Sequence, residues 1–290
     1  MGGIVMNTER KILVTGAKGF VGARVMEYFK DAIAFPSEIL RASSPEKGVV
    51  EYVKRVQPAA IIHTAAISDI GACEKDPDAS YLANVILPDA LNKAAMEEKI
   101  KLLMFSSDQV YTGMTEEGPF SDETELPEPT NTYARHKLLS EKRTLDKNSD
   151  CVHLRATWMY DMPLYNHKNR ANFLTIALKA AQTGMPMDAS VNQHRAVTYV
   201  RQVAENLEKM LSVPGGAYNY GSANGENMYD TTIAFFRALG LNEKALALVR
   251  KTENPGSLWM KPDKLNRNGV YFDTTIEGFD RVIKDYALKG

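Results

Sequence analysis

Short apolar runs alternate with amphipathic stretches along the first 155 residues of the chain. The apolar runs are rich in β-branched and aliphatic side chains, which is typical of strands buried on both faces. They cover residues 11–15, 32–35, 59–63, 101–106 and 151–155. Hydrophobic positions recur at helical spacing over residues 19–29, 49–56, 79–97 and 131–145. This alternation predicts an α/β fold with a parallel sheet covered on both faces, the doubly wound, Rossmann-like arrangement.

The pattern loosens after residue 155, where prolines and glycines divide the chain into shorter pieces. Two further helices are predicted there, over residues 172–183 and 199–211. We expect residues 1–156 to form a Rossmann domain. Residues 157–290 are expected to supply the last sheet strands, interleaved with a smaller substrate-binding lobe.

Three glycines follow the first predicted strand at intervals of three residues, Gly16, Gly19 and Gly22. Glycines at a strand-to-helix turn let the backbone approach a pyrophosphate, with amides of the helix N-terminus directed at the anion. The pattern predicts a dinucleotide site. A plain strand-turn-helix corner is the alternative, because such glycine patterns also arise by accident.

Tyr133 and Lys137 are four residues apart on a predicted helix, so their side chains share one face. A nearby ammonium favours the phenolate and brings a tyrosine closer to useful proton exchange. Ser107, at the end of the fourth predicted strand, is placed to donate a hydrogen bond to a carbonyl oxygen. The alternative is a surface aromatic beside a solvated lysine. Together with the glycine turn, the three residues predict hydride transfer to or from a carbonyl.

Composition narrows the class of protein. The formal net charge of −1 provides no basic field for nucleic acid, which is not an expected partner. No apolar run approaches the roughly 20 residues of a membrane span, and the first residues do not resemble a secretory signal. The two cysteines, Cys73 and Cys151, lack metal-site spacing and indicate buried thiols, and no metal site is expected. We expect a cytoplasmic protein.

These motifs resemble those of the extended short-chain dehydrogenase/reductases, and most closely the dTDP-4-dehydrorhamnose reductase-like branch. The resemblance implies that Ser107, Tyr133 and Lys137 are catalytic, with Tyr133 and Lys137 also contacting the cofactor. It further implies a set of cofactor-binding residues along the first half of the chain: Gly16, Lys18, Gly19, Phe20, Val21, Gly22, Thr64, Ala65, Ala66 and Asn84. Asp108, Trp158 and Lys261 match positions on the substrate side.

Two departures from the family pattern refine the expected chemistry. Related dehydratases carry an Asp-Glu pair after the catalytic hydroxyl, whereas here Gln109 follows Asp108. An amide does not exchange a proton at neutral pH, so dehydration is disfavoured. Near the C-terminus, Lys261-Pro262 replaces a frequent Arg-Pro, so a diphosphate would meet a point charge rather than a bidentate fork.

Cofactor choice depends on the region about 20 residues beyond the glycine turn. An acid is expected there in an NAD-binding protein, but Pro36 occupies the place. Lys18 and Arg41 are suited to bind a 2′-phosphate. If the Glu38 side chain points inward, its negative charge argues against binding of that phosphate. We expect NADP in preference to NAD.

The sequence therefore predicts an NAD(P)H-dependent reductase that acts on a keto group of a nucleotide-activated sugar. A homodimer is a possible assembly. Two alternatives remain. One is a non-catalytic, NADP-binding regulatory subunit of the same fold, because close relatives include such partners and fold alone does not settle function. The other is a sugar-nucleotide epimerase, which would hold its cofactor tightly and need no external reductant.

Overall fold

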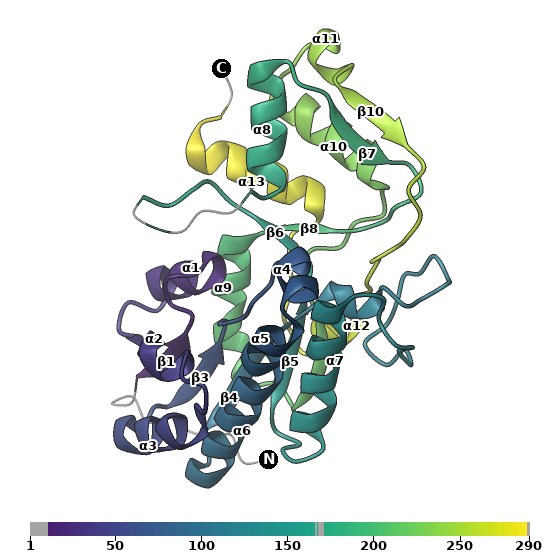
Figure 1. Ribbon diagram of the computed structural model, residues 1–290. Coiled ribbons are helices and arrows are strands. Elements are labelled where there is room, and N and C mark those ends of the chain that lie inside the picture. The colour runs from purple at the N-terminus through teal and green to yellow at the C-terminus, as the bar shows by residue number, and fades with distance from the viewer. Residues whose placement is uncertain (1–10, 166, 168–170, 289–290) are drawn as a thin grey trace.

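The computed structural model describes residues 11–165, 167 and 171–288. Its centre is a six-stranded sheet with the strand order β2-β1-β3-β4-β5-β9, and every pairing is parallel. The strands are β1 (Ile12–Thr15), β2 (Ile33–Ala34), β3 (Ala60–His63), β4 (Lys101–Ser107), β5 (Val152–Ala156) and β9 (Gly216–Tyr220). The predicted α/β class and the parallel sheet are confirmed (Figure 1).

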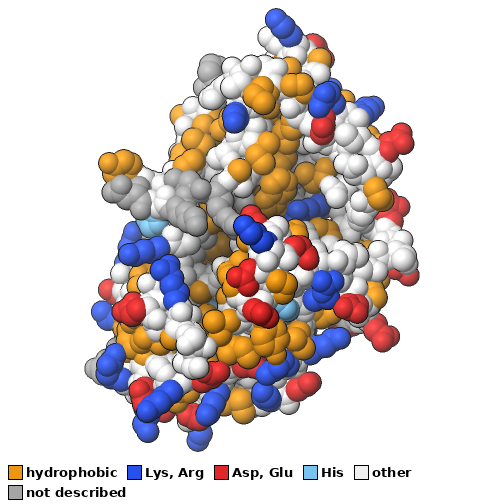
Figure 2. All heavy atoms as spheres, viewed as in Figure 1, with side chains coloured by type: hydrophobic (Ala, Val, Ile, Leu, Met, Phe, Trp, Pro, Cys, Tyr) orange, Lys and Arg blue, Asp and Glu red, His pale blue; other side chains and the backbone are white. Residues whose placement is uncertain are grey.

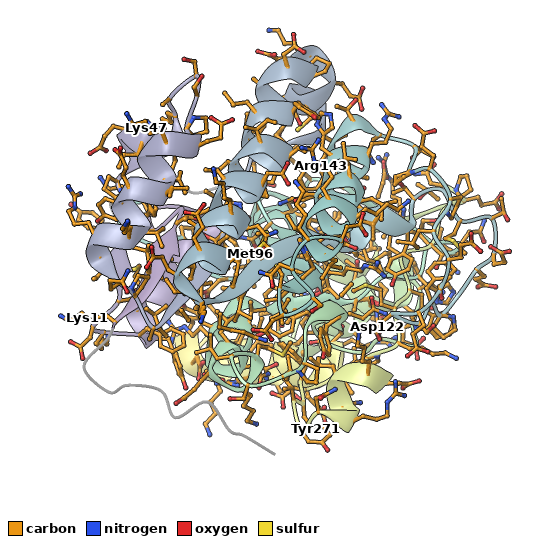
Figure 3. All side chains as sticks on the ribbon, turned by 90° about the horizontal axis from the view of Figure 1, so that it is seen from below. Lys11, Lys47, Met96, Asp122, Arg143 and Tyr271 are labelled. Atoms are coloured by element: carbon orange, nitrogen blue, oxygen red, sulfur yellow. The ribbon has the colours of Figure 1, made fainter. Side chains whose placement is uncertain are left out.

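Helices cover both faces of this sheet. On one face lie α3 (Glu46–Val56), α6 (Leu87–Glu98) and α7 (Thr132–Leu145), and Figure 3 shows Lys47, Met96 and Arg143 marking them from below. On the other face lie α1 (Phe20–Tyr28) and α9 (Val200–Met210). Because side chains alternate along a strand, Leu13 of β1 belongs to the core under α3 and α6. Its neighbour Val14 belongs to the core under α1 and α9.

The prediction of one continuous helix over residues 79–97 is wrong in detail. The chain instead forms α5 (Pro77–Tyr81), a π-helical turn η1 (Leu82–Ile86) and then α6. Pro88, in the first turn of α6, has no N–H to donate to the carbonyl of Asn84, and the widened turn lies directly before it. A short helix α4 (Ile70–Lys75), capped by Asp69, was not predicted. The site described below uses both segments.

Beyond β5 the chain builds a second unit, which we call the C-terminal lobe, above the carboxyl ends of the strands (Figure 1). It contains two small parallel pairs, β6 (Trp158–Tyr160) with β8 (Val197–Tyr199), and β7 (Met187–Ser190) with β10 (Val249–Thr252). Its helices are α8 (Phe173–Thr183), α10 (Met228–Ala238), α11 (Glu243–Leu246) and α13 (Thr275–Tyr286).

The core of the C-terminal lobe is aromatic: Phe173, Phe235 and Phe279 are fully buried and pack ring against ring. Helix α9, strand β9 and the short α12 (Asp263–Arg267) follow residue 157 but lie with the sheet. The helices predicted over 172–183 and 199–211 are confirmed by α8 and α9. The division of the chain near residue 156 stays a prediction. No helix within the described residues is both long and apolar enough to cross a membrane.

A buried ion pair joins α1 to the C-terminal lobe. Arg24 Nε lies 3.0 Å from Asp161 Oδ2, and the two side chains are 2% and 1% exposed. Arg24 Nη2 also donates to the carbonyl of Met162, and Tyr286 donates its hydroxyl proton to Asp161 Oδ1. The carboxylate is therefore satisfied from two sides, which a buried charge requires.

We predict that Arg24→Met lowers the free energy of unfolding by about 3–5 kcal/mol, because it leaves the buried Asp161 carboxylate without its principal counter-charge. The matched control is Lys47→Met, which breaks the exposed i,i+4 pair with Glu51. That change should stay within about 0.5 kcal/mol. Urea denaturation at pH 7 measures both. Equal effects of the two substitutions would contradict the structural role of the Arg24–Asp161 pair.

Candidate active site

The turn between β1 and α1 is packed so closely that only glycine fits at two of its positions. Gly16 adopts a φ of +68°, and a Cβ there would lie 2.7 Å from the amide nitrogen of Ala65. A Cβ on Gly22 would lie 2.1 Å from the carbonyl oxygen of Gly16. Gly19 precedes the first turn of α1, where helix amides without intrahelical partners point outward. This cradle has the shape and the donors that a pyrophosphate requires.

The segment after β3 is fixed against this turn. Thr64 Oγ1 donates to the carbonyl of Thr15 at 2.7 Å, and the amide of Ala65 donates to Thr15 Oγ1 at 3.3 Å. From behind, Asn84 of the π-helical turn donates through Nδ2 to the carbonyl of Ile67 at 2.9 Å. Asn84 is fully buried, and its amide also donates to Ser80 Oγ at 3.1 Å. Its predicted contact with a cofactor stays a prediction.

The other residues predicted to contact a cofactor surround the cradle more openly. Lys18 is exposed on the glycine turn, Phe20 and Val21 begin α1 half-buried, and Ala66 is exposed after β3. Arg41 is exposed and ends α2 (Ser37–Leu40), the helix after β2. Both cations are therefore exposed, and their predicted contact with a 2′-phosphate stays a prediction.

Ser107, Tyr133 and Lys137 come together at the carboxyl end of β4. Lys137 Nζ donates to the carbonyl of Phe105 at 2.8 Å and lies 5.8 Å from the centroid of the Tyr133 ring. The Ser107 side chain lies close enough to the Tyr133 hydroxyl to lower the pKa of that phenol. All three side chains are buried. Sheet and helix thus bring together residues separated by up to 30 positions in the sequence.

Helix α7 is held in place at its first turn, which fixes Tyr133. Asn131 caps the helix by accepting a hydrogen bond from the amide of Ala134 at 2.9 Å. Glu74 of α4 accepts hydrogen bonds from the amide and the hydroxyl of Thr132. The unpredicted helix α4 therefore positions the tyrosine through the N-terminus of α7.

Burial governs the protonation of this group. It raises the pKa of Tyr133, and the hydrogen bond with Ser107 offsets part of that effect. Burial also lowers the pKa of Lys137 to about 8, against the raising effect of Glu141. The phenol therefore keeps its proton at neutral pH, and the lysine is poised close to physiological pH. This is the arrangement of a proton donor beside a cation.

A second buried charge pair supports the site from beneath. Arg155 contacts both carboxylate oxygens of Glu141, with Nη2 to Oε2 at 2.8 Å and Nε to Oε1 at 3.3 Å. Ser106 donates its hydroxyl proton to Glu141 Oε1. The Ser106 hydroxyl is therefore committed to this pair, whereas the Ser107 hydroxyl donates to Asp108 Oδ1 at 3.2 Å.

On the substrate side, Asp108 is engaged by an arginine that the sequence analysis did not single out. Arg195 Nε lies 2.7 Å from Asp108 Oδ2 and its Nη2 lies 3.0 Å from Oδ1. The guanidinium also lies 5.3 Å from the ring centroid of Trp158. Arg195 could not be found from local pattern, because its partner is 87 positions away. The signal that could have found it is that residues 192–198 resemble a later block of the dTDP-4-dehydrorhamnose reductase-like branch.

Lys261 is held through its backbone, whose amide donates to the carbonyl of Phe120 at 2.7 Å, and its side chain is exposed. The neighbouring Trp259 stacks on His194 with ring centroids 5.0 Å apart. Figure 2 shows the molecule hollowed between the C-terminal lobe and the sheet half, with hydrophobic side chains gathered on the side of the lobe. The substrate roles of Asp108, Trp158 and Lys261 stay predictions.

Known proteins with similar sequences include bacterial and vertebrate relatives. The chain is 26% identical over 258 residues to the spore coat polysaccharide biosynthesis protein SpsK of Bacillus subtilis, covering 87% of each chain. It is 36% identical over 119 residues to a dTDP-4-dehydrorhamnose reductase of Escherichia coli, covering 41% of this chain and 39% of that protein. It is also 25% identical over 283 residues to the methionine adenosyltransferase 2 subunit beta of Xenopus laevis, covering 90% and 83%.

A solved structure shares the fold. The dTDP-4-dehydrorhamnose reductase of Bacillus anthracis, crystallised in complex with NADP, superposes with a TM-score of 0.81 at 22% identity, covering 95% of this chain and 98% of that one. The family model described as the RmlD substrate binding domain matches residues 10–263. The resemblance read from the sequence is confirmed, and the chain belongs to the RmlD substrate binding domain family.

Proposed function

We propose that this protein is a reductase that uses NAD(P)H to reduce a keto group on a nucleotide-activated sugar, with the 4-keto group of a deoxysugar as the preferred case. The observation that carries the proposal is the convergence of Ser107, Tyr133 and Lys137 at the end of β4. The glycine cradle at the end of the neighbouring β1 supports it. Family membership supports the same class of chemistry.

The side chains divide the work of carbonyl reduction. A bound reduced nicotinamide would supply the hydride. Ser107 donates a hydrogen bond to the carbonyl oxygen and orients the keto group. Tyr133 delivers its phenolic proton to the oxygen as negative charge develops there. The Lys137 ammonium stabilises the phenolate that remains and is placed to hold a ribose hydroxyl.

For the cofactor we propose NADP in preference to NAD. Lys18 and Arg41 are both exposed near the cradle, where a 2′-phosphate needs a cation. Pro36, which follows β2, offers no carboxylate to a ribose 2′-hydroxyl. The NADP complex of the related Bacillus anthracis reductase supports this choice.

Replacing Tyr133 by phenylalanine tests the proton donor. We expect turnover of dTDP-4-keto-6-deoxy sugar to fall by at least about 10²-fold, the usual contribution of a general acid. NADPH affinity, followed by fluorescence titration, should stay within a few-fold. The control is Tyr28→Phe, which changes an exposed tyrosine of α1 and should keep full turnover. A Tyr133→Phe enzyme as active as wild type would remove the assignment.

The cradle makes a separate prediction. Gly22→Ala places a methyl group against the Gly16 carbonyl, so it should displace the turn and weaken NADPH binding by roughly tenfold or more, about 1.4 kcal/mol. Gly225→Ala is the matched control, because a Cβ there meets nothing within 4 Å. Isothermal titration calorimetry measures both affinities. Unchanged affinity in Gly22→Ala would show that the cofactor does not use this turn.

The pKa of Lys137 predicts a pH dependence of stability. Its folded-state pKa of about 8 lies below the ordinary 10.5, so between these values the unfolded chain binds more protons and the native state gains stability as pH rises. The Lys137→Met variant lacks the ionisable lysine and therefore this pH-dependent contribution to the free energy of unfolding. The free energy of unfolding of wild type, relative to Lys137→Met, should therefore rise from pH 8 to pH 10 in urea titrations.

The control for this series is Lys142→Met, an exposed lysine of the same helix. Its difference from wild type should stay flat over the same pH range. A flat difference for Lys137→Met as well would mean that the ammonium is not buried in solution.

A second candidate function is a regulatory subunit of a larger enzyme. It is favoured by the similarity to a methionine adenosyltransferase 2 subunit beta, which extends over 90% of this chain. The complete set of Ser107, Tyr133 and Lys137 argues against a purely binding role, since binding alone does not require all three. Tight NADPH binding without turnover of any keto-sugar, together with a stoichiometric enzyme partner on purification, would favour this candidate.

A further inference from the structure

The ion pair between Asp108 and Arg195 crosses from the sheet half of the molecule to the C-terminal lobe. Asp108 follows β4 directly and is 1% exposed, while Arg195 precedes β8 and its side chain is 20% exposed. The contact is bidentate, with both Asp108 oxygens engaged. Bidentate arginine–carboxylate pairs fix orientation as well as charge. The pair therefore sets the position of the lobe relative to the end of β4.

One oxygen of Asp108 is shared with the proposed catalytic hydroxyl. Oδ1 accepts a hydrogen bond from Ser107 Oγ at 3.2 Å and another from Arg195 Nη2 at 3.0 Å. A buried carboxylate without a counter-charge would hold the Ser107 proton strongly. The Arg195 guanidinium supplies that counter-charge and weakens the hold of Asp108 on the Ser107 proton. The Ser107 hydroxyl is then able to turn toward a substrate oxygen.

Asp108 and Arg195 also act on Tyr133 with opposite signs. The Asp108 charge raises the pKa of the phenol and the Arg195 charge lowers it. The other groups that bear on this phenol are Ser107, Cys73 and the ammonium of Lys137. Without Arg195, the carboxylate beside the phenol would be left unbalanced, and Tyr133 would become a weaker acid.

Arg195 is held rigidly for this task. Its guanidinium lies over the Trp158 ring, and its carbonyl accepts a hydrogen bond from Asn224 Nδ2 at 3.0 Å. The preceding carbonyl, of His194, accepts from the amide of Leu258 at 2.8 Å. Two hydrogen bonds thus hold the backbone at residues 194 and 195, and the guanidinium rests on one ring, so the side chain loses less freedom when it binds Asp108.

We propose that Arg195 is a positioning residue of the reduction: by clamping Asp108 it frees the Ser107 hydroxyl for the substrate carbonyl and balances the charge beside Tyr133. The inference rests on the proposed function, because it assigns Arg195 to the same site. It adds a residue that binds neither the reacting carbonyl nor the cofactor cradle. It also makes the C-terminal lobe part of the catalytic machinery.

The kinetic test compares Arg195→Met, Asp108→Asn and the double variant by the pH profile of kcat for keto-sugar reduction with NADPH. Arg195→Met should lower kcat roughly 10- to 100-fold and move the alkaline limb of the profile to higher pH. The double variant should move that limb back toward wild type, because the unbalanced charge is gone. Cofactor affinity should stay within a few-fold in all three.

The matched control is Arg250→Met, which breaks an exposed pair with Asp188 in the same lobe, made by a single contact from Nε to Oδ1. It should leave kcat and the profile unchanged. A merely structural Arg195 would lower kcat in Arg195→Met without moving the alkaline limb. If the limb does move, its failure to return in the double variant would be a second contrary result. Either result overturns the proposal. Arg195→Lys, which keeps the charge but loses the fork, should be intermediate in kcat and keep the limb near wild type.

A second readout does not depend on turnover. Protein labelled with 3-fluorotyrosine gives a ¹⁹F resonance for Tyr133, assigned by its loss in Tyr133→Phe. Arg195→Met should shift this resonance at pH 7, the double variant should return it toward wild type, and Arg250→Met should not move it. An unmoved resonance in folded Arg195→Met refutes the inference. Wild-type protein that fails to reduce the keto-sugar refutes the proposed function instead, and leaves this spectral test in force.

Discussion

The parallel pairing of β1, β3 and β4 is the constraint on which the rest of the site depends. Their register places Thr15 beside His63, and His63 beside Met104, so the three strands end at one edge of the sheet. The glycine turn, the segment after β3 and the Ser107 hydroxyl all emerge at that edge. Parallel strands in such sheets carry their ligands outside the carboxyl ends. The C-terminal lobe lies above the same edge (Figure 1).

Three ion pairs, each with a buried carboxylate, hold this arrangement together. Each joins two different segments of the fold: Arg24 with Asp161, Arg155 with Glu141, and Arg195 with Asp108. The first attaches α1 to the lobe, the second supports the strand end beneath the proposed catalytic group, and the third crosses to the substrate side. A buried charge is strongly destabilising when its partner is removed, so the first and third pairs select one relative placement of sheet and lobe. The chemistry proposed here requires that placement.

Local pattern predicted much of the fold and little of this ionic framework. The strands were readable because buried parallel strands are continuous apolar runs, and α7 because its apolar residues recur at helical spacing. Helix α4 was missed because Asp69 caps a helix of only 6 residues with one buried side chain, Cys73. The π-helical turn at Asn84 was missed because hydrophobic spacing does not distinguish it from α-helix. Arg195 was missed because its role depends on Asp108, which only folding brings close to it. The roles of Ser107, Tyr133 and Lys137 were predicted by order and spacing, and they stay predictions until tested.

The most direct test of the central claim follows the hydride. Purified protein would be supplied with NADPH deuterated at C4 of the nicotinamide, in each stereochemical position, and with dTDP-4-keto-6-deoxy sugar. The account predicts that one of the two labelled forms transfers a single deuterium to the former carbonyl carbon, detected by mass spectrometry of the sugar product. Conversion of the sugar without deuterium from either form would indicate an epimerase. Binding of NADPH with no conversion at all would contradict the account and indicate a regulatory subunit.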